Sequence, residues 1–72
     1  MIITTIVNHR LYIQFSSWVT NGKITVSERD NFKEEIAVSN SDFEIIKLPD
    51  DIKNLRIVVE SDEKTIIKNL KL

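Results

Sequence analysis

The sequence predicts an all-β protein, a small antiparallel β-sandwich or barrel of about six short strands. Composition is the first reason: twelve Ile, six Val and five Thr stand against five Leu and one Ala. Side chains branched at Cβ suit a pleated sheet better than a helix. The second reason is the alternation of apolar and polar residues along 11–20. The third is the even spacing of short polar breaks, which indicates antiparallel neighbours.

The first strands are predicted over residues 2–7 and 11–20. Residues 2–7 are apolar on both faces, which is typical of a strand inside a sheet. We expect this uncharged segment to be paired on both sides, because at a free edge it would invite aggregation. After 11–20, the dipeptide Asn21-Gly22 and the strand 23–26 predict a tight hairpin. Such a type I′ turn requires positive φ at both central residues.

Residues 27–38 are compatible with two structures. The polar start of this stretch and the spacing of Phe32 and Ile36 favour a short helical turn near residues 28–36. The alternation of Phe32, Ile36 and Val38 with charged residues favours a strand instead. We predict a strand over the second half of the stretch.

Three further strands are predicted in the remaining sequence. A turn at 39–42 precedes a strand over 43–48, which Pro49 ends. A strand over 55–60 and a turn at 61–64 lead into a last strand over 65–72. We expect the lysines of this last segment to protect a sheet edge. Neither a repeat nor a linker interrupts the sequence, which we interpret as one domain over residues 1–72.

The sequence carries no signature of catalysis or of metal binding. The absence of cysteine excludes zinc ribbons and thiol chemistry, and a single glycine cannot form a phosphate-binding loop. The lone His9 lies in a predicted turn. The acidic pairs at 34–35, 50–51 and 62–63 lack the spacing of a calcium loop. We therefore expect a protein that is not an enzyme and that uses no cofactor and no metal.

Composition also bears on where the protein works. The apolar runs are too short to span a bilayer, and the N-terminal residues do not have the pattern of a signal peptide. The lack of cysteine is compatible with a reducing compartment, so we expect a cytoplasmic protein. The usage rich in Ile, Asn and Lys resembles that of small proteins from AT-rich bacterial genomes and their phages or plasmids. This resemblance implies an accessory or inhibitory protein.

The candidate functional surface is one face of the strand predicted over residues 11–20. Alternation places Leu11, Ile13, Phe15 and Val19 on the core side. The candidate binding residues on the other face are Tyr12, Gln14, Ser16 and Trp18. Because Trp and Tyr are enriched at protein interfaces, we predict a non-catalytic module that binds another protein through this stripe. Self-association through a sheet edge is a further possibility for a partner. The competing interpretation is that Trp18 packs into the core.

The alternative function is that of a nucleic-acid-binding small β-barrel. Such barrels stack bases on aromatic side chains inside a positive groove. Tyr12 and Trp18 would supply the aromatic rings, with Arg10 and Lys23 close by in sequence. The net charge of −1 and the pI near 5.7 do not fit the basic excess of such proteins. We therefore expect no appreciable binding to nucleic acid.

Overall fold

A computed structural model describes residues 2–29, 31–61 and 64–72 and confirms the all-β fold class. The strands are β1 (Ile2–Val7), β2 (Arg10–Glu28), β3 (Phe32–Lys47), β4 (Asn54–Ser61) and β5 (Thr65–Lys71). The described residues thus form five strands rather than six. No helix occurs in the described ranges, so the helical turn considered near residues 28–36 is wrong. Instead, the N–H of Asn31 donates to the carbonyl of Glu28 at 2.9 Å in a turn between β2 and β3.

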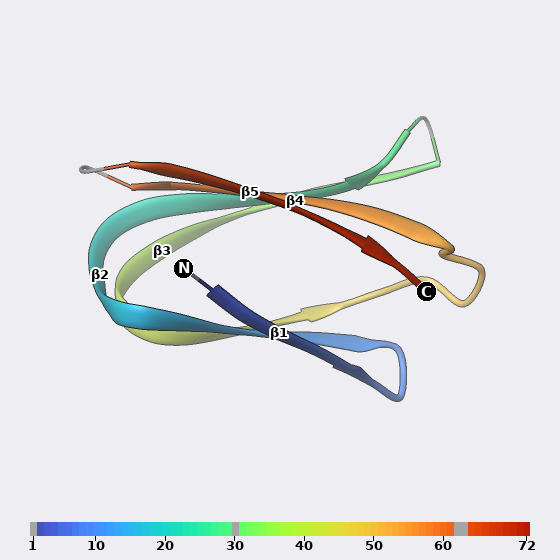
Figure 1. Ribbon diagram of the computed structural model, residues 1–72, viewed down its shortest axis with the longest axis horizontal. Helices are drawn as coiled ribbons and strands as arrows, with labels where there is room; N and C mark the ends of the chain where they lie inside the picture. Colours follow the sequence, from blue (N-terminus) through green and yellow to red (C-terminus); the bar gives the residue numbers. More distant parts are fainter. Residues whose placement is uncertain (1, 30, 62–63) are drawn as a thin grey trace.

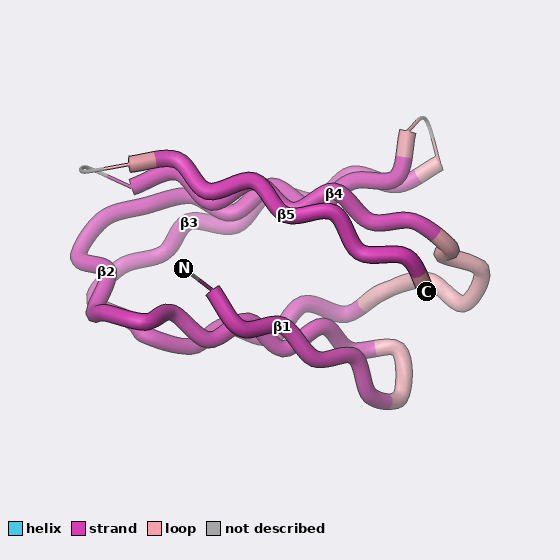
Figure 2. The backbone as a smooth tube through the Cα atoms, in the orientation of Figure 1, coloured by secondary structure: helices cyan, strands magenta, loops and turns pink. Residues whose placement is uncertain are grey.

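The sheet is open and strongly curled, because the long strands β2 and β3 both bend and run through two layers (Figure 1). The lower layer consists of β1, residues 10–15 of β2 and residues 43–47 of β3. The upper layer consists of β3 up to residue 41, the second half of β2, β4 and β5. All of these neighbours are antiparallel, and the result is a half-barrel (Figure 2).

The predicted hairpin at Asn21-Gly22 is wrong. β2 continues through both residues, and Gly22 is paired with Val38 of β3 and Ser61 of β4. Its φ is not positive. The irregularity in β2 lies earlier, between Gln14 and Val19, where the strand passes from the lower to the upper layer. At Asn21-Gly22 the chain therefore continues as a paired strand and does not reverse.

The turn predicted at 39–42 is also wrong, because here too a strand continues through the predicted turn. β3 runs through this segment, where Ser39 and Ser41 pair with the part of β2 just after its bend. Asn40 between them has a φ of 51°, a left-handed conformation that asparagine tolerates better than most residues. The polar cluster therefore accommodates the curl of β3.

The two-residue hairpin turn of this protein is at Asn8-His9. Their φ values are 51° and 62°, and the flanking residues Val7 and Arg10 are paired. Positive φ at both central residues is the mark of a type I′ turn, whose twist matches that of the strands. The turn connects β1 to β2 and sets the register of the lower layer.

The core lies between the two layers and is entirely apolar. The predicted inward set on β2 is confirmed, since Leu11, Ile13 and Phe15 are buried and Val19 packs against the core. The remaining buried side chains come from β1 to β4 and the loop after β3, and β5 adds the partly buried Ile66 and Leu70: Ile2, Ile24, Val26, Val38, Ile46, Leu48, Leu55, Ile57 and Val59. No helix in the described ranges is long and apolar enough to cross a membrane.

Of the two outer strands β1 and β5, one differs from the expectation. β1 pairs with β2 and, in the described part of the chain, with no other strand, so the expectation that residues 2–7 are paired on both sides is wrong. β5 pairs with β4 alone among the described strands, which confirms that the lysine-bearing last segment is an edge. The expected turn at 61–64 is partly outside the described residues, but its ends are joined by a hydrogen bond from the N–H of Ser61 to the carbonyl of Lys64.

Candidate functional site

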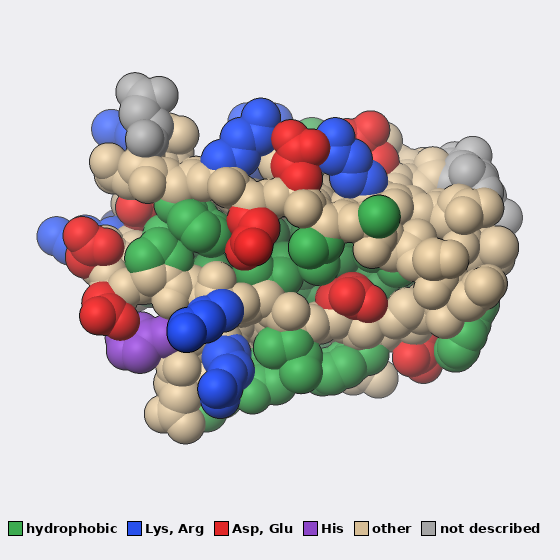
Figure 3. All heavy atoms as spheres, turned by 180° about the vertical axis from the view of Figure 1, so that it is seen from behind, with side chains coloured by type: hydrophobic (Ala, Val, Ile, Leu, Met, Phe, Trp, Pro, Cys, Tyr) green, Lys and Arg blue, Asp and Glu red, His purple; other side chains and the backbone are tan. Residues whose placement is uncertain are grey.

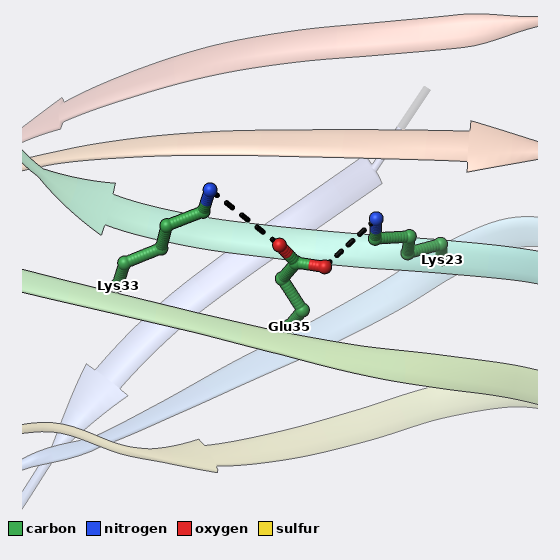
Figure 4. Close-up of polar contacts among 3 residues, drawn as sticks. All are labelled: Lys23, Lys33 and Glu35. Atoms are coloured by element: carbon green, nitrogen blue, oxygen red, sulfur yellow. Dashed lines mark ion pairs between the residues drawn. The ribbon is translucent and has the colours of Figure 1, made fainter.

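The outer face of the upper layer is mainly polar and charged, although Ile67 of β5 is exposed there. Lys23 on β2 pairs with Glu35 on β3, with 2.8 Å between Nζ and Oε2, and Lys33 lies 3.5 Å from the other carboxylate oxygen (Figure 4). The hydrogen bond and charge of Glu35 raise the pKa of Lys23, and Lys23 lowers the pKa of Glu35 in return. These side chains are about half exposed, so water screens the pairs and they add little stability. This face has the composition expected of a surface in contact with solvent.

The outer face of the lower layer has the opposite character. Four apolar side chains there are well exposed: Ile3 by 61%, Val7 by 47%, Phe43 by 43% and Ile45 by 51%. The ring of Tyr12 is half-buried because it stacks on Phe43, with 6.0 Å between the ring centroids and 28° between the planes. We call these five residues the outer apolar face. Seen from behind, hydrophobic side chains gather along the lower layer (Figure 3).

Strand pairing explains why these side chains lie together. Ile3 of β1 is paired with Gln14 of β2, and Gln14 is paired with Phe43 of β3. In the next outward row, Tyr12 lies between Thr5 of β1 and Ile45 of β3. Paired residues point to the same side of a sheet, so the three strands present one continuous surface. Arg10 and Lys47 are paired at the end of this surface nearest the Asn8-His9 turn.

The four candidate residues of β2 are divided by the bend of that strand. Tyr12 and Gln14 belong to the lower layer, next to the outer apolar face. Ser16 and Trp18 lie in the bend, where β2 has no paired residues. Trp18 is 60% exposed and outside the buried core, so the interpretation that it packs into the core is not supported. β2 curls at this point (Figure 1), so Trp18 does not belong to the lower layer that carries Tyr12.

Trp18 instead borders a cavity between the bend of β2, the end of β4 and the start of β5. This cavity has a volume of about 340 Å³, and its apolar lining includes Phe15, Val59 and Ile66. Lys64 lines it as well. The volume is at the lower limit for a small-molecule site, and none of the described polar side chains is buried in it. The cavity is therefore a hollow beside the bend.

A larger hollow of about 930 Å³ lies at the opposite end, between the β2–β3 turn and the ends of β4 and β5. Its lining is mainly polar and includes Glu28, Lys53 and Arg56. One carboxylate oxygen of Glu28 accepts the backbone N–H groups of Asn54 and Lys53, each at 2.7 Å. These hydrogen bonds lower the pKa of Glu28. Glu28 thus fastens the loop before β4 to the end of β2.

The single histidine lies at the surface beside an acidic residue. Nε2 of His9 lies 3.8 Å from the Asp50 carboxylate, and the two side chains are 60% and 93% exposed. Neither residue lines one of the two hollows described above. Among residues 2–29, 31–61 and 64–72, no three His, Asp or Glu side chains gather where they could hold a metal ion.

Sequence reasoning missed most of the outer apolar face. It singled out Tyr12 and assigned residues 2–7 to the interior of a sheet, and it predicted a strand over 43–48 without assigning that strand an outward face. The signal was present, because both segments have apolar residues at successive positions and hence on both faces of a strand. The same pattern describes a fully buried strand.

Comparisons with protein-family models, curated proteins and solved structures gave no significant match.

Proposed function

We propose that this protein is a non-catalytic module that binds another protein through its outer apolar face. The observation that carries the proposal is the contrast between the two layers. One layer presents salt-bridged side chains to solvent, whereas the other presents Ile3, Tyr12, Phe43 and Ile45 as one surface. Contiguous exposed apolar surface of this kind marks interaction sites, because leaving it in water is unfavourable.

The neighbours of the aromatic rings favour a protein partner over nucleic acid. Tyr12 and Phe43 stack on each other, and Ile45 lies in register with Tyr12. Basic side chains occur only at one end of this surface among the described residues, where Arg10 pairs with Lys47. Where bases stack on aromatic rings, basic side chains beside the rings contact the phosphates of the nucleic acid. The aliphatic side chains around Tyr12 and Phe43 cannot make such contacts. An apolar centre with a polar end is the composition of a protein interface.

The broader setting of the proposal comes from composition. A small cysteine-free protein rich in Ile, Asn and Lys fits an accessory or inhibitory protein of a bacterium, phage or plasmid that works in the cytoplasm. Such a protein would act by occupying a surface of its partner.

The chain offers a matched pair of residues to test the proposal. Ile45 on the lower layer is 51% exposed, and Ile67 on the upper layer is 53% exposed. We propose to immobilise the wild type, Ile45→Lys and Ile67→Lys, each checked for folding by circular dichroism, and to compare the proteins that they retain from a lysate of the source cell. A partner retained by the wild type and by Ile67→Lys but lost with Ile45→Lys supports the proposal.

Two results would overturn it. If Ile45→Lys retains the same partners as the wild type, the outer apolar face does not bind them. If the wild type binds a single-stranded oligonucleotide with sub-micromolar, salt-sensitive affinity, the nucleic-acid alternative replaces the proposal. Fluorescence anisotropy of a labelled oligonucleotide at two salt concentrations measures this directly.

A further inference from the structure

The free edge of β1 is the second unusual surface of the molecule. β1 pairs with β2 along all six of its residues without irregularity, and its other side has no partner among the described strands (Figure 1). The strand reads Ile-Ile-Thr-Thr-Ile-Val, with no charged residue, no proline and no glycine. Natural proteins usually equip edge strands with such residues or with bulges to prevent pairing with other chains.

The other free edges of the sheet do carry such protection. β5 contains Lys68 and Lys71 and follows Lys64. β3 carries charged residues along its length and contains Asn40 in a left-handed conformation. Two copies of β5, placed side by side, would bring like charges close together, which is destabilising. In β3, the left-handed residue interrupts the regular edge that a second copy would need. Within the described residues, β1 is the edge that a second copy can extend without either obstacle.

The hairpin turn determines which backbone groups of β1 face the free edge. In a two-residue type I′ hairpin, the residues that flank the turn form a hydrogen-bonded pair, here Val7 and Arg10. Along an antiparallel ladder, hydrogen-bonded pairs alternate with pairs that are not hydrogen-bonded. Ile3 and Thr5 therefore also direct their backbone N–H and C=O groups toward β2. The N–H and C=O groups of Ile2, Thr4 and Ile6 therefore point away from β2, toward the free edge.

We propose that two copies of this protein dimerise by antiparallel pairing of their β1 strands. Thr4 of one copy lies opposite Thr4 of the other, at the two-fold axis, and Ile2 lies opposite Ile6. These three residue pairs form about six backbone hydrogen bonds. The two lower layers join into one continuous sheet. The contact is made by backbone groups and not by the outer apolar face, so this inference does not depend on the proposed function.

The size of the contact indicates a dimer that dissociates on dilution. Six residues at about 3.3 Å each make a contact about 20 Å long. A junction between two strands of this length buries less than the roughly 800 Å² per partner that is typical of stable complexes. We therefore expect a dimer at about 100 μM and monomers at about 1 μM.

Analytical ultracentrifugation of three proteins tests the inference. For the wild type, we expect a mass near twice 8.4 kDa at the higher concentration and near 8.4 kDa after dilution. Thr4→Pro should be monomeric at both concentrations, because it removes an N–H that faces the edge and leaves the hydrogen bonds to β2 in place. The control Ile45→Lys alters the outer apolar face on the far strand of the layer and should still form dimers.

Several results would overturn the inference. A wild type that stays monomeric at about 100 μM contradicts it, and so does a Thr4→Pro variant that dimerises as well as the wild type. If Ile45→Lys is monomeric and Thr4→Pro is not, the outer apolar face makes the dimer. Should Thr4→Pro fail to fold, hydrogen exchange of the wild type decides. The amides of Thr4 and Ile6 should exchange more slowly at high protein concentration, and an exchange rate independent of concentration rejects the pairing.

Discussion

The carbonyl oxygen of Glu60 lies 2.7 Å from the position that a Cβ atom on Gly22 would occupy. A contact this short is essentially never seen for a real Cβ, and Cγ1 of Val19 lies at 3.1 Å on another side. Gly22 is paired with β4 at this point, directly after the bend of β2. The missing side chain therefore allows β2 and β4 to approach each other where the chain enters the upper layer.

Gly22→Ala is expected to destabilise the protein by at least about 1 kcal/mol, and Gly22→Val by more. Replacing glycine by alanine inside a strand normally increases stability. A loss of stability in Gly22→Ala would therefore indicate that the backbone of β4 lies too close for a Cβ atom. Chemical denaturation measures the change, with the neighbouring exposed residue as a control: Asn21→Ala should stay within about 0.5 kcal/mol of the wild type. An unchanged midpoint for Gly22→Ala would show that β4 does not lie so close.

Trp18→Ala is expected to leave the melting temperature almost unchanged, because the side chain is 60% exposed and outside the core. Phe15, three residues earlier and 7% exposed, is the matched comparison. Phe15→Ala should cost about 3–5 kcal/mol, since it removes a buried ring and leaves a cavity. Melting both variants by circular dichroism tests the burial pattern of the bend, and losses of similar size would contradict it.

His9→Gly is expected to stabilise the protein by about 0.5–1 kcal/mol. His9 has a φ of 62°, which glycine adopts without the steric cost that a Cβ brings. The exposed contact with Asp50 that this change removes contributes little. Thermal unfolding at neutral pH is the measurement. A variant clearly less stable than the wild type would argue against a type I′ turn at this position.

The Glu28 carboxylate should make stability depend on pH in the acidic range. Hydrogen bonds from the N–H groups of Asn54 and Lys53 lower its pKa in the folded state. The carboxylate of Glu28 therefore contributes fully to folding stability above its pKa in the unfolded chain, about 4.3. This contribution is lost as the pH falls through its lower pKa in the folded state. Glu28→Gln should accordingly be less stable than the wild type at pH 7, with a difference that shrinks below about pH 4. Melting curves across this range would refute the interpretation if the difference were constant.

The sequence was sufficient to predict the fold class and the inward face of β2, because both depend on local properties. Branching at Cβ favours sheets wherever the strand lies, and Leu11, Ile13 and Phe15 point inward simply because side chains alternate. The turns were predicted less well. The residues of Asn21-Gly22 suit a type I′ turn, but the backbone of Glu60 uses the space beside Gly22 in another way. That neighbour is 38 residues away in the sequence and leaves no local signal.

The candidate surface was predicted in part for a related reason. Tyr12 and Gln14 were placed on the outward face by alternation, and the structure has them there. Ile3 was assigned to an interior strand, because a strand with apolar residues on both faces has the same sequence pattern whether its second face is covered by this chain or left for a partner. Ile45 was placed on a predicted strand but assigned to neither of its faces. Trp18 was grouped with Tyr12 because a straight strand was assumed, and the bend of β2 turns it elsewhere.

The sharing of β2 and β3 between the layers has a consequence for how the molecule unfolds. Apart from the pair β4–β5 in the upper layer, every strand pairing in either layer includes β2. Loss of the central hairpin removes the scaffold of both layers at once. Unfolding should therefore be an all-or-none event in which the slowest-exchanging amides of β2 and β3 report one common free energy, whichever layer they belong to.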